Sequence, residues 1–121
     1  MKSAWALALS AALMLLCSCT NPIHDQSKLR SIKAEARALE ATHPIKPPRD
    51  LADVPASEWP PVIASLKPER VTVDARGVHV WIKFYFDDAW GYEIPHDENA
   101  RPKPARCYSE PGPGVFWLGP C

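Results

Sequence analysis

The sequence predicts a small α+β domain, an antiparallel β-meander of three or four strands with a short packed helix, preceded by a signal peptide and a tether. Three observations predict it. The chain has 121 residues, enough for one small domain. Two stretches between residues 70 and 94 alternate apolar and polar residues with a period of two. The 14 prolines disfavour long helices and all lie at or after Pro22.

The first residues have the parts of a secretory signal peptide. Lys2 supplies a positive charge, residues 4–16 form an apolar run, and small residues with cysteines follow. This run is shorter than the ~20 apolar residues that span a bilayer. We therefore expect export and cleavage rather than a transmembrane helix.

The end of this segment resembles the lipobox of bacterial lipoprotein precursors, over about the first 20 residues only. The resemblance is carried by Leu16, Cys17, Ser18 and Cys19. It implies cleavage before Cys19, diacylglycerol on the Cys19 sulfur, and acylation of the new amino terminus, for example with palmitate. Thr20 rather than aspartate follows, which implies an outer-membrane anchor facing the periplasm. Several fatty chains anchor a protein stably. A plain signal peptide with a secreted product is the alternative.

Cleavage before Cys19 would leave two further cysteines, Cys107 and Cys121. An even pair in an oxidising compartment predicts a disulfide bond. A bridge that closes a loop of about 15 residues contributes ~3 kcal/mol by the chain-entropy relation. Two free thiols are the alternative.

After the signal peptide at residues 1–18, we expect a lipidated tether over residues 19–50. Apolar residues at helical spacing predict one helix at about residues 27–41, and they are Leu29, Ile32, Ala36 and Leu39. Because this stripe is thin, the helix is expected to be a spacer that leans on the domain, or else to rest on anionic headgroups. Prolines around Pro47 then form a stiff linker.

The folded domain is expected at residues 51–121. Ser57 is predicted to cap a short helix that packs across the apolar face of the sheet. The expected strands are residues 70–74, 78–86, 92–94 and, as a fourth, 115–118. In the longest strand, alternation places one set of apolar residues on the core face, namely Val78, Val80, Ile82, Phe84 and Phe86.

The opposite face of this strand and the return strand carry large aromatic side chains, which are typical of recognition surfaces. The candidate binding residues are His79, Trp81, Tyr85, Trp90 and Tyr92. The alternative is that the tether helix or residues 96–106 cover these side chains, which would make them a second core layer.

The charge balance excludes a strongly basic nucleic-acid binder, since Lys plus Arg and Asp plus Glu each number 14. We expect the membrane, through the lipid, and an envelope protein or cell-wall glycan as partners. No catalytic residue, metal or cofactor is assigned, and the predicted function is a non-enzymatic binding module, of which an inhibitor or immunity protein is one specific form. The alternatives are a structural spacer or assembly factor, and a metal-dependent or hydrolytic enzyme using His79, Asp87, Asp88 and His96.

Overall fold

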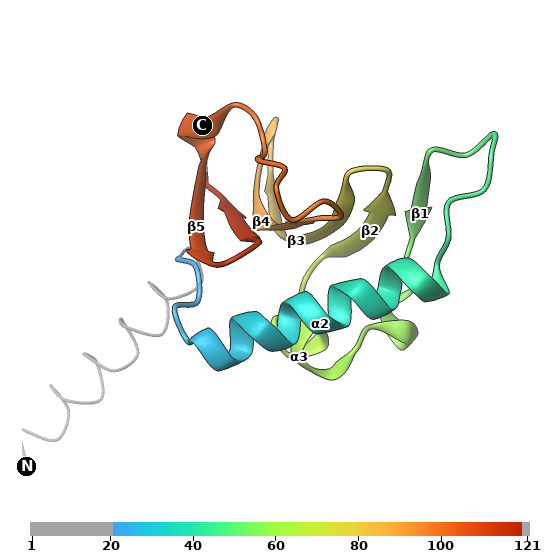
Figure 1. The fold of residues 1–121 in the computed structure, drawn as a ribbon, viewed down its shortest axis with the longest axis horizontal. Coiled ribbons are helices and arrows are strands. Elements are labelled where there is room, and N and C mark those ends of the chain that lie inside the picture. The colour runs from blue at the N-terminus through green and yellow to red at the C-terminus, as the bar shows by residue number, and fades with distance from the viewer. Residues whose placement is uncertain (1–20, 120–121) are drawn as a thin grey trace, which may run out of the picture.

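A computed structural model describes residues 21–119. One long helix, α2 (Gln26–Thr42), lies against a six-stranded antiparallel sheet (Figure 1). The strands in spatial order are β1 (Leu51–Asp53), β2 (Arg70–Asp74), β3 (Gly77–Tyr85), β4 (Asp88–Pro95), β6 (Val115–Leu118) and β5 (Tyr108–Gly112). The short helices are η2 (Ala56–Glu58), α3 (Pro61–Ser65) and η3 (Ala105–Cys107). Among the described residues, none of these helices is both long and apolar enough to cross a membrane.

The α+β class is confirmed, but three or four strands is too few. The expected fourth strand is present as β6, which lies between β4 and β5. The unexpected strands are β1, with only three residues, and β5, which contains Pro111 and Gly112. Neither segment has the periodic apolar pattern that would predict a strand from sequence. Each is an edge strand that forms by pairing with a neighbouring strand, β1 with β2 and β5 with β6.

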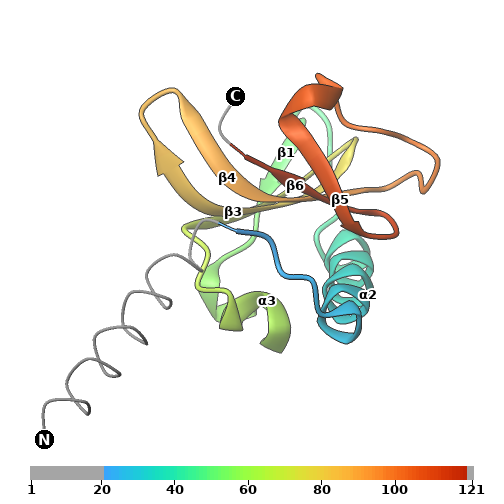
Figure 2. The same ribbon diagram turned by 90° about the vertical axis from the view of Figure 1, so that its left-hand side faces the viewer.

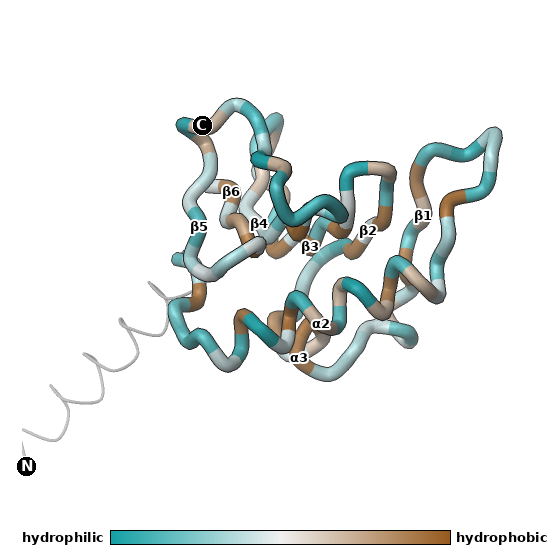
Figure 3. Tube along the Cα trace, viewed as in Figure 1, coloured by the Kyte–Doolittle hydropathy of each residue, from teal (hydrophilic) through white to brown (hydrophobic). Residues whose placement is uncertain are grey.

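Helix α2 is an integral part of the core. Asp25 caps its start, with Oδ1 accepting hydrogen bonds from the backbone N–H groups of Ser27 and Lys28. Its four predicted apolar residues are all buried, in the same cluster as the valines of β2 and β3. Figure 2 shows α2 covering one side of the sheet, and Figure 3 shows hydrophobic positions recurring along it. The helix predicted as a spacer is thus one of the two layers of the fold.

The helix predicted to begin at Ser57 starts later. Ser57 is exposed in η2, and α3 begins at Pro61 with no side-chain cap from its own segment. Its first free N–H groups are instead satisfied by Glu35 of α2. The carboxylate of Glu35 accepts from Val62 N at 3.0 Å and from Ile63 N at 2.8 Å. This cap comes from a distant segment of the chain, so local sequence could not show it.

A β-bulge changes which side chains of β3 face the core. Val80 lies opposite Tyr92, but the register with β4 shifts between Trp81 and Lys83. One extra residue reverses the two faces beyond that point. As a result Phe84 and Phe86, predicted to lie in the core, are 44% and 94% exposed, while Ile82 is half-buried.

Candidate functional site

The sheet face away from α2 carries a buried polar cluster. Thr72 on β2, His79 on β3 and Glu93 on β4 lie directly opposite one another in register, and all three are buried. His79 Nδ1 lies 3.1 Å from Glu93 Oε1. His79 Nε2 lies 3.1 Å from Asp74 Oδ2 without making a hydrogen bond. The strands thus hold one imidazole between two carboxyl groups.

Trp81 closes this cluster on one side. Its ring stacks on that of His79, with centroids 5.4 Å apart and planes inclined by 8°. Its indole Nε1–H donates to Thr72 Oγ1 at 3.2 Å. Both the stacking and the hydrogen bond fix the indole, so Trp81 and His79 form a rigid side of the cluster.

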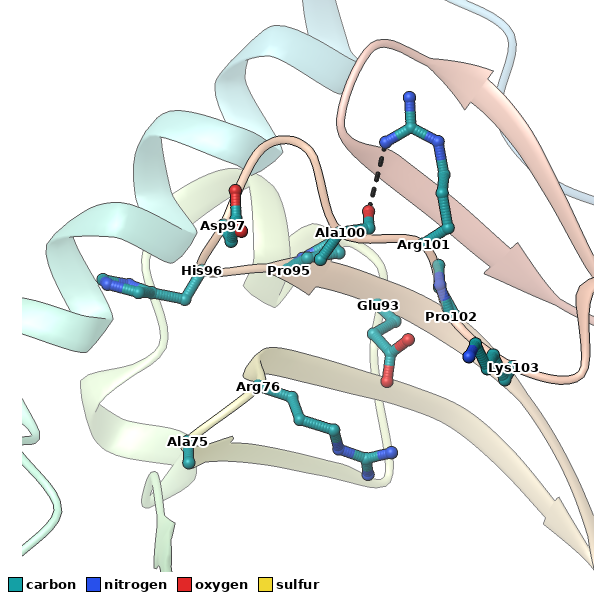
Figure 4. Close-up of a pocket in the computed structure, with 10 residues that line it drawn as sticks. All are labelled: Ala75, Arg76, Glu93, Pro95, His96, Asp97, Ala100, Arg101, Pro102 and Lys103. Atoms are coloured by element: carbon teal, nitrogen blue, oxygen red, sulfur yellow. Dashed lines mark hydrogen bonds between the residues drawn. The ribbon is translucent and has the colours of Figure 1, made fainter.

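A cavity of about 380 Å³ opens beside Glu93. It lies between the β2–β3 turn, the end of β4, and residues 96–103 (Figure 4). In this view the Glu93 carboxylate points into the space between the side chains of Arg76 and Lys103, which are both exposed. We call this cavity, with Arg76, Glu93 and Lys103, the Glu93 pocket.

Two other lining residues turn away from the Glu93 pocket (Figure 4). His96 Nδ1 is hydrogen-bonded to the Glu40 carboxylate on α2. Arg101 lies over the Phe116 ring, 5.5 Å from its centroid, and donates to the carbonyl oxygens of Glu98 and Ala100. These contacts hold residues 96–101 against the body, whereas the side chains of Arg76 and Lys103 lie on either side of the Glu93 carboxylate (Figure 4).

Burial raises the pKa of Glu93 above its ordinary value, an effect opposed by the charges of His79 and Arg76 and reinforced by Asp74. Burial, followed by the charge of Glu93, also raises the pKa of Tyr108. A carboxyl group with a raised pKa can accept hydrogen bonds when ionised and donate one when protonated. The Glu93 pocket thus places a carboxyl group with a raised pKa beside the cationic side chains of Arg76 and Lys103.

The raised pKa of Glu93 predicts a specific pH dependence of stability. The native state binds this proton more tightly than the unfolded state does, so Glu93 contributes stability at low pH that is lost as pH rises through its native pKa. The free energy of unfolding of the wild type, relative to Glu93→Gln, should fall as pH rises above the ordinary value of 4.5. Urea denaturation of both proteins from pH 4 to 8 measures this difference. Parallel curves of unfolding free energy against pH would contradict the prediction.

The five candidate binding residues do not form one face. His79 is 4% exposed in the polar cluster, and Trp81 is half-buried beside it. Tyr92 is buried in the core, where its ring packs on Trp117 with centroids 4.9 Å apart. Trp90 is partly buried against the core and meets Tyr85, which is 54% exposed. The prediction of a single aromatic face is therefore wrong, because of the bulge in β3 and the inward side of β4.

The structure describes one of the two cysteines of the predicted disulfide bond. Cys107, in η3, is buried and disulfide-bonded. It is the only cysteine among the described residues, and Cys121 lies outside them. The pairing of Cys107 with Cys121 therefore stays a prediction. The lipobox cysteines, Cys17 and Cys19, also lie outside the described residues.

The residues considered for a hydrolytic or metal site lie apart. His79 is buried on the sheet face, Asp87 lies in the β3–β4 turn, Asp88 begins β4, and His96 contacts α2. Between residues 21 and 119, no group of three or more His, Cys, Asp or Glu side chains is placed to hold a metal ion.

No protein-family model, curated protein or solved structure matches this chain. A functional argument therefore starts from the polar cluster, the Glu93 pocket and the surface around them.

Proposed function

We propose that this chain is a lipid-anchored binding protein of the bacterial cell envelope, and that it recognises an envelope protein at the Glu93 pocket. The anchor is the lipid expected on Cys19, which would place the protein on the outer membrane facing the periplasm. The observation that carries the binding role is the buried carboxyl group of Glu93 at an open cavity. Burying a glutamate is costly, and such groups concentrate at functional sites.

The chemistry of the Glu93 pocket favours an acidic segment of the partner. Arg76 has a side chain that is 76% exposed, and its nearest ion-pair contact, Asp74, is 3.7 Å away. Its guanidinium can therefore form a bidentate pair with an incoming carboxylate. Lys103 adds a second cationic side chain at the same cavity. An inhibitor or immunity protein is one specific form of this role.

Site-specific crosslinking in intact cells tests the proposal. A photo-reactive amino acid at Ala100, an exposed residue that lines the Glu93 pocket, leaves both cations in place and should give a discrete crosslinked protein. Arg76→Glu in the same chain should abolish that product, because it reverses the charge that receives the partner's carboxylate. The matched control is the probe at Arg49, which is exposed but lies outside the Glu93 pocket. No protein product from the probe at Ala100, or a product unchanged by Arg76→Glu, would overturn the proposal.

A further inference from the structure

Three consecutive aromatic side chains at the end of the β3–β4 hairpin face solvent. We call Phe84, Tyr85 and Phe86 the aromatic tip. They are 44%, 54% and 94% exposed, and among the described residues the one other exposed large hydrophobic side chain is Leu51. Figure 2 shows the hairpin projecting from the body on the side away from α2. Clustered exposed rings of this kind mark a surface that docks on something apolar.

The aromatic tip is held in its exposed position by the backbone around it. The Phe84 N–H donates to Glu69 Oε2 at 3.0 Å, and Phe86 has a φ of 54°, the left-handed conformation of a tight turn. Rings also support one another. Tyr85 meets Phe86 edge-on at 5.1 Å between centroids, and Phe84 stacks on Trp81 at 5.5 Å. These contacts fix the conformation of the aromatic tip.

The start of the described chain is tied to the same hairpin. The backbone N–H of Ile23 donates to the Tyr92 hydroxyl oxygen at 2.9 Å, and α2 begins three residues later. Cys19 precedes Ile23 by four residues, which can span at most about 14 Å. Along β4, the six residues from Tyr92 to Phe86 span about 20 Å. These two spans allow a lipid on Cys19 and the aromatic tip to meet the same bilayer surface.

We propose that the aromatic tip inserts into the interfacial layer of the membrane that holds the lipid anchor. This inference rests on the proposed lipidation of Cys19. Aromatic rings are favoured at the boundary between headgroups and acyl chains. Asp87 and Asp88 at the turn limit the depth of insertion, since carboxylates stay among the headgroups. Contact should therefore weaken as the fraction of anionic lipid rises, with Lys83 offsetting part of this repulsion.

Membrane contact at the tip would orient the whole domain. The tip pair Tyr85–Asp88 and the pair Gly77–Pro95 lie at opposite ends of the β3–β4 ladder. Strand β3 has nine residues, a length of about 30 Å. Because the Glu93 pocket lies at the Gly77–Pro95 end, it would face away from the bilayer, toward proteins of the periplasm.

Fluorescence quenching of the full lipidated protein in vesicles tests the insertion. Quenching by phosphatidylcholine vesicles with brominated rather than unbrominated acyl chains should be greater for Phe86→Trp than for the wild type, whose own tryptophans set the background. The control is Leu51→Trp, which should show no quenching beyond that of the wild type because Leu51 is 37% exposed at the Gly77 end of the sheet. Phe86 is almost fully exposed, so its substitution should leave the fold intact, and circular dichroism checks this.

The outcomes separate the insertion from the anchor. Mass spectrometry of the same sample reports lipidation independently. A lipidated protein in which the Phe86→Trp signal is not quenched overturns the insertion and leaves the anchor standing. If the chain carries no lipid, the anchor prediction fails, and the same variant is tethered to the vesicles through a lipid coupled at its amino terminus: quenching then supports the insertion, and no quenching overturns it. A protein adduct from a photo-reactive residue at Phe86, without quenching, would instead make the tip a protein-docking surface.

Discussion

Gly77→Ala is expected to lower the free energy of unfolding by about 2–6 kcal/mol, the sum of backbone strain and overpacking. Gly77 has a φ of 147°, which side-chain-bearing residues rarely adopt. A Cβ there would lie 2.1 Å from the carbonyl oxygen of Ile94 and 2.7 Å from the backbone nitrogen of His96. These are backbone atoms of the strand and segment that border the Glu93 pocket, so they cannot move aside without opening the ladder.

Gly119→Ala is the matched control for Gly77→Ala. The atom nearest a Cβ at Gly119 is Trp117 Nε1 at 3.8 Å, an ordinary contact. Urea denaturation of the three proteins gives both differences. Equal stabilities of Gly77→Ala and Gly119→Ala would contradict the close approach of the β2–β3 turn to the end of β4.

Ile32→Ala should lower the free energy of unfolding by about 2–5 kcal/mol, the usual range for a buried isoleucine. Ile32 is 0% exposed and lies in the core cluster with Val78 and Val80. Truncation would leave a cavity between the helix layer and the sheet. The control is Lys28→Ala, at an exposed position of the same helix, which should change stability by at most about 0.5 kcal/mol.

Chemical denaturation of both α2 variants measures the difference. A loss for Ile32→Ala no greater than that for Lys28→Ala would mean that α2 is dispensable to the core. The helix would then be the spacer that its thin apolar stripe predicts.

The helix could be predicted from sequence because its signal is local. Its four apolar residues recur at helical spacing, and Asp25 stands where a cap is needed. Its packing in the core could not be predicted, because an apolar stripe that includes Ala36 is too thin to indicate a core helix. In the fold, a small residue such as Ala36 allows the helix to approach its neighbours closely and is fully buried. Packing rather than hydrophobic content decides the place of this helix.

The site was less accessible to sequence reasoning than the fold. Alternation assigns His79 to a non-core face correctly, but its burial depends on Asp74 and Glu93, which come from the two neighbouring strands. The sequence did indicate one pair of this cluster, because the turn at residues 75–77 places Thr72 opposite His79. The bulge at Ile82 has no such signal, and it is the bulge that puts Phe84 and Phe86 in solvent.

The proposed roles use the two ends of one hairpin ladder. The aromatic tip would contact the membrane, and the Glu93 pocket would face the periplasm at the other end. Because the Ile23 N–H is hydrogen-bonded to the Tyr92 hydroxyl oxygen, only residues 20–22 separate this contact from the expected anchor. This arrangement depends on a lipid at Cys19.

The most direct test of that dependence is the intact mass of the mature protein. The precursor is expressed in a bacterium, and the chain is purified from the membrane fraction beside a Cys19→Ala control. We predict a chain that begins at Cys19 and carries a diacylglyceryl group and an amide-linked acyl chain, with neither modification in the control. An unmodified chain, or one that begins at any other residue, would contradict the lipid anchor.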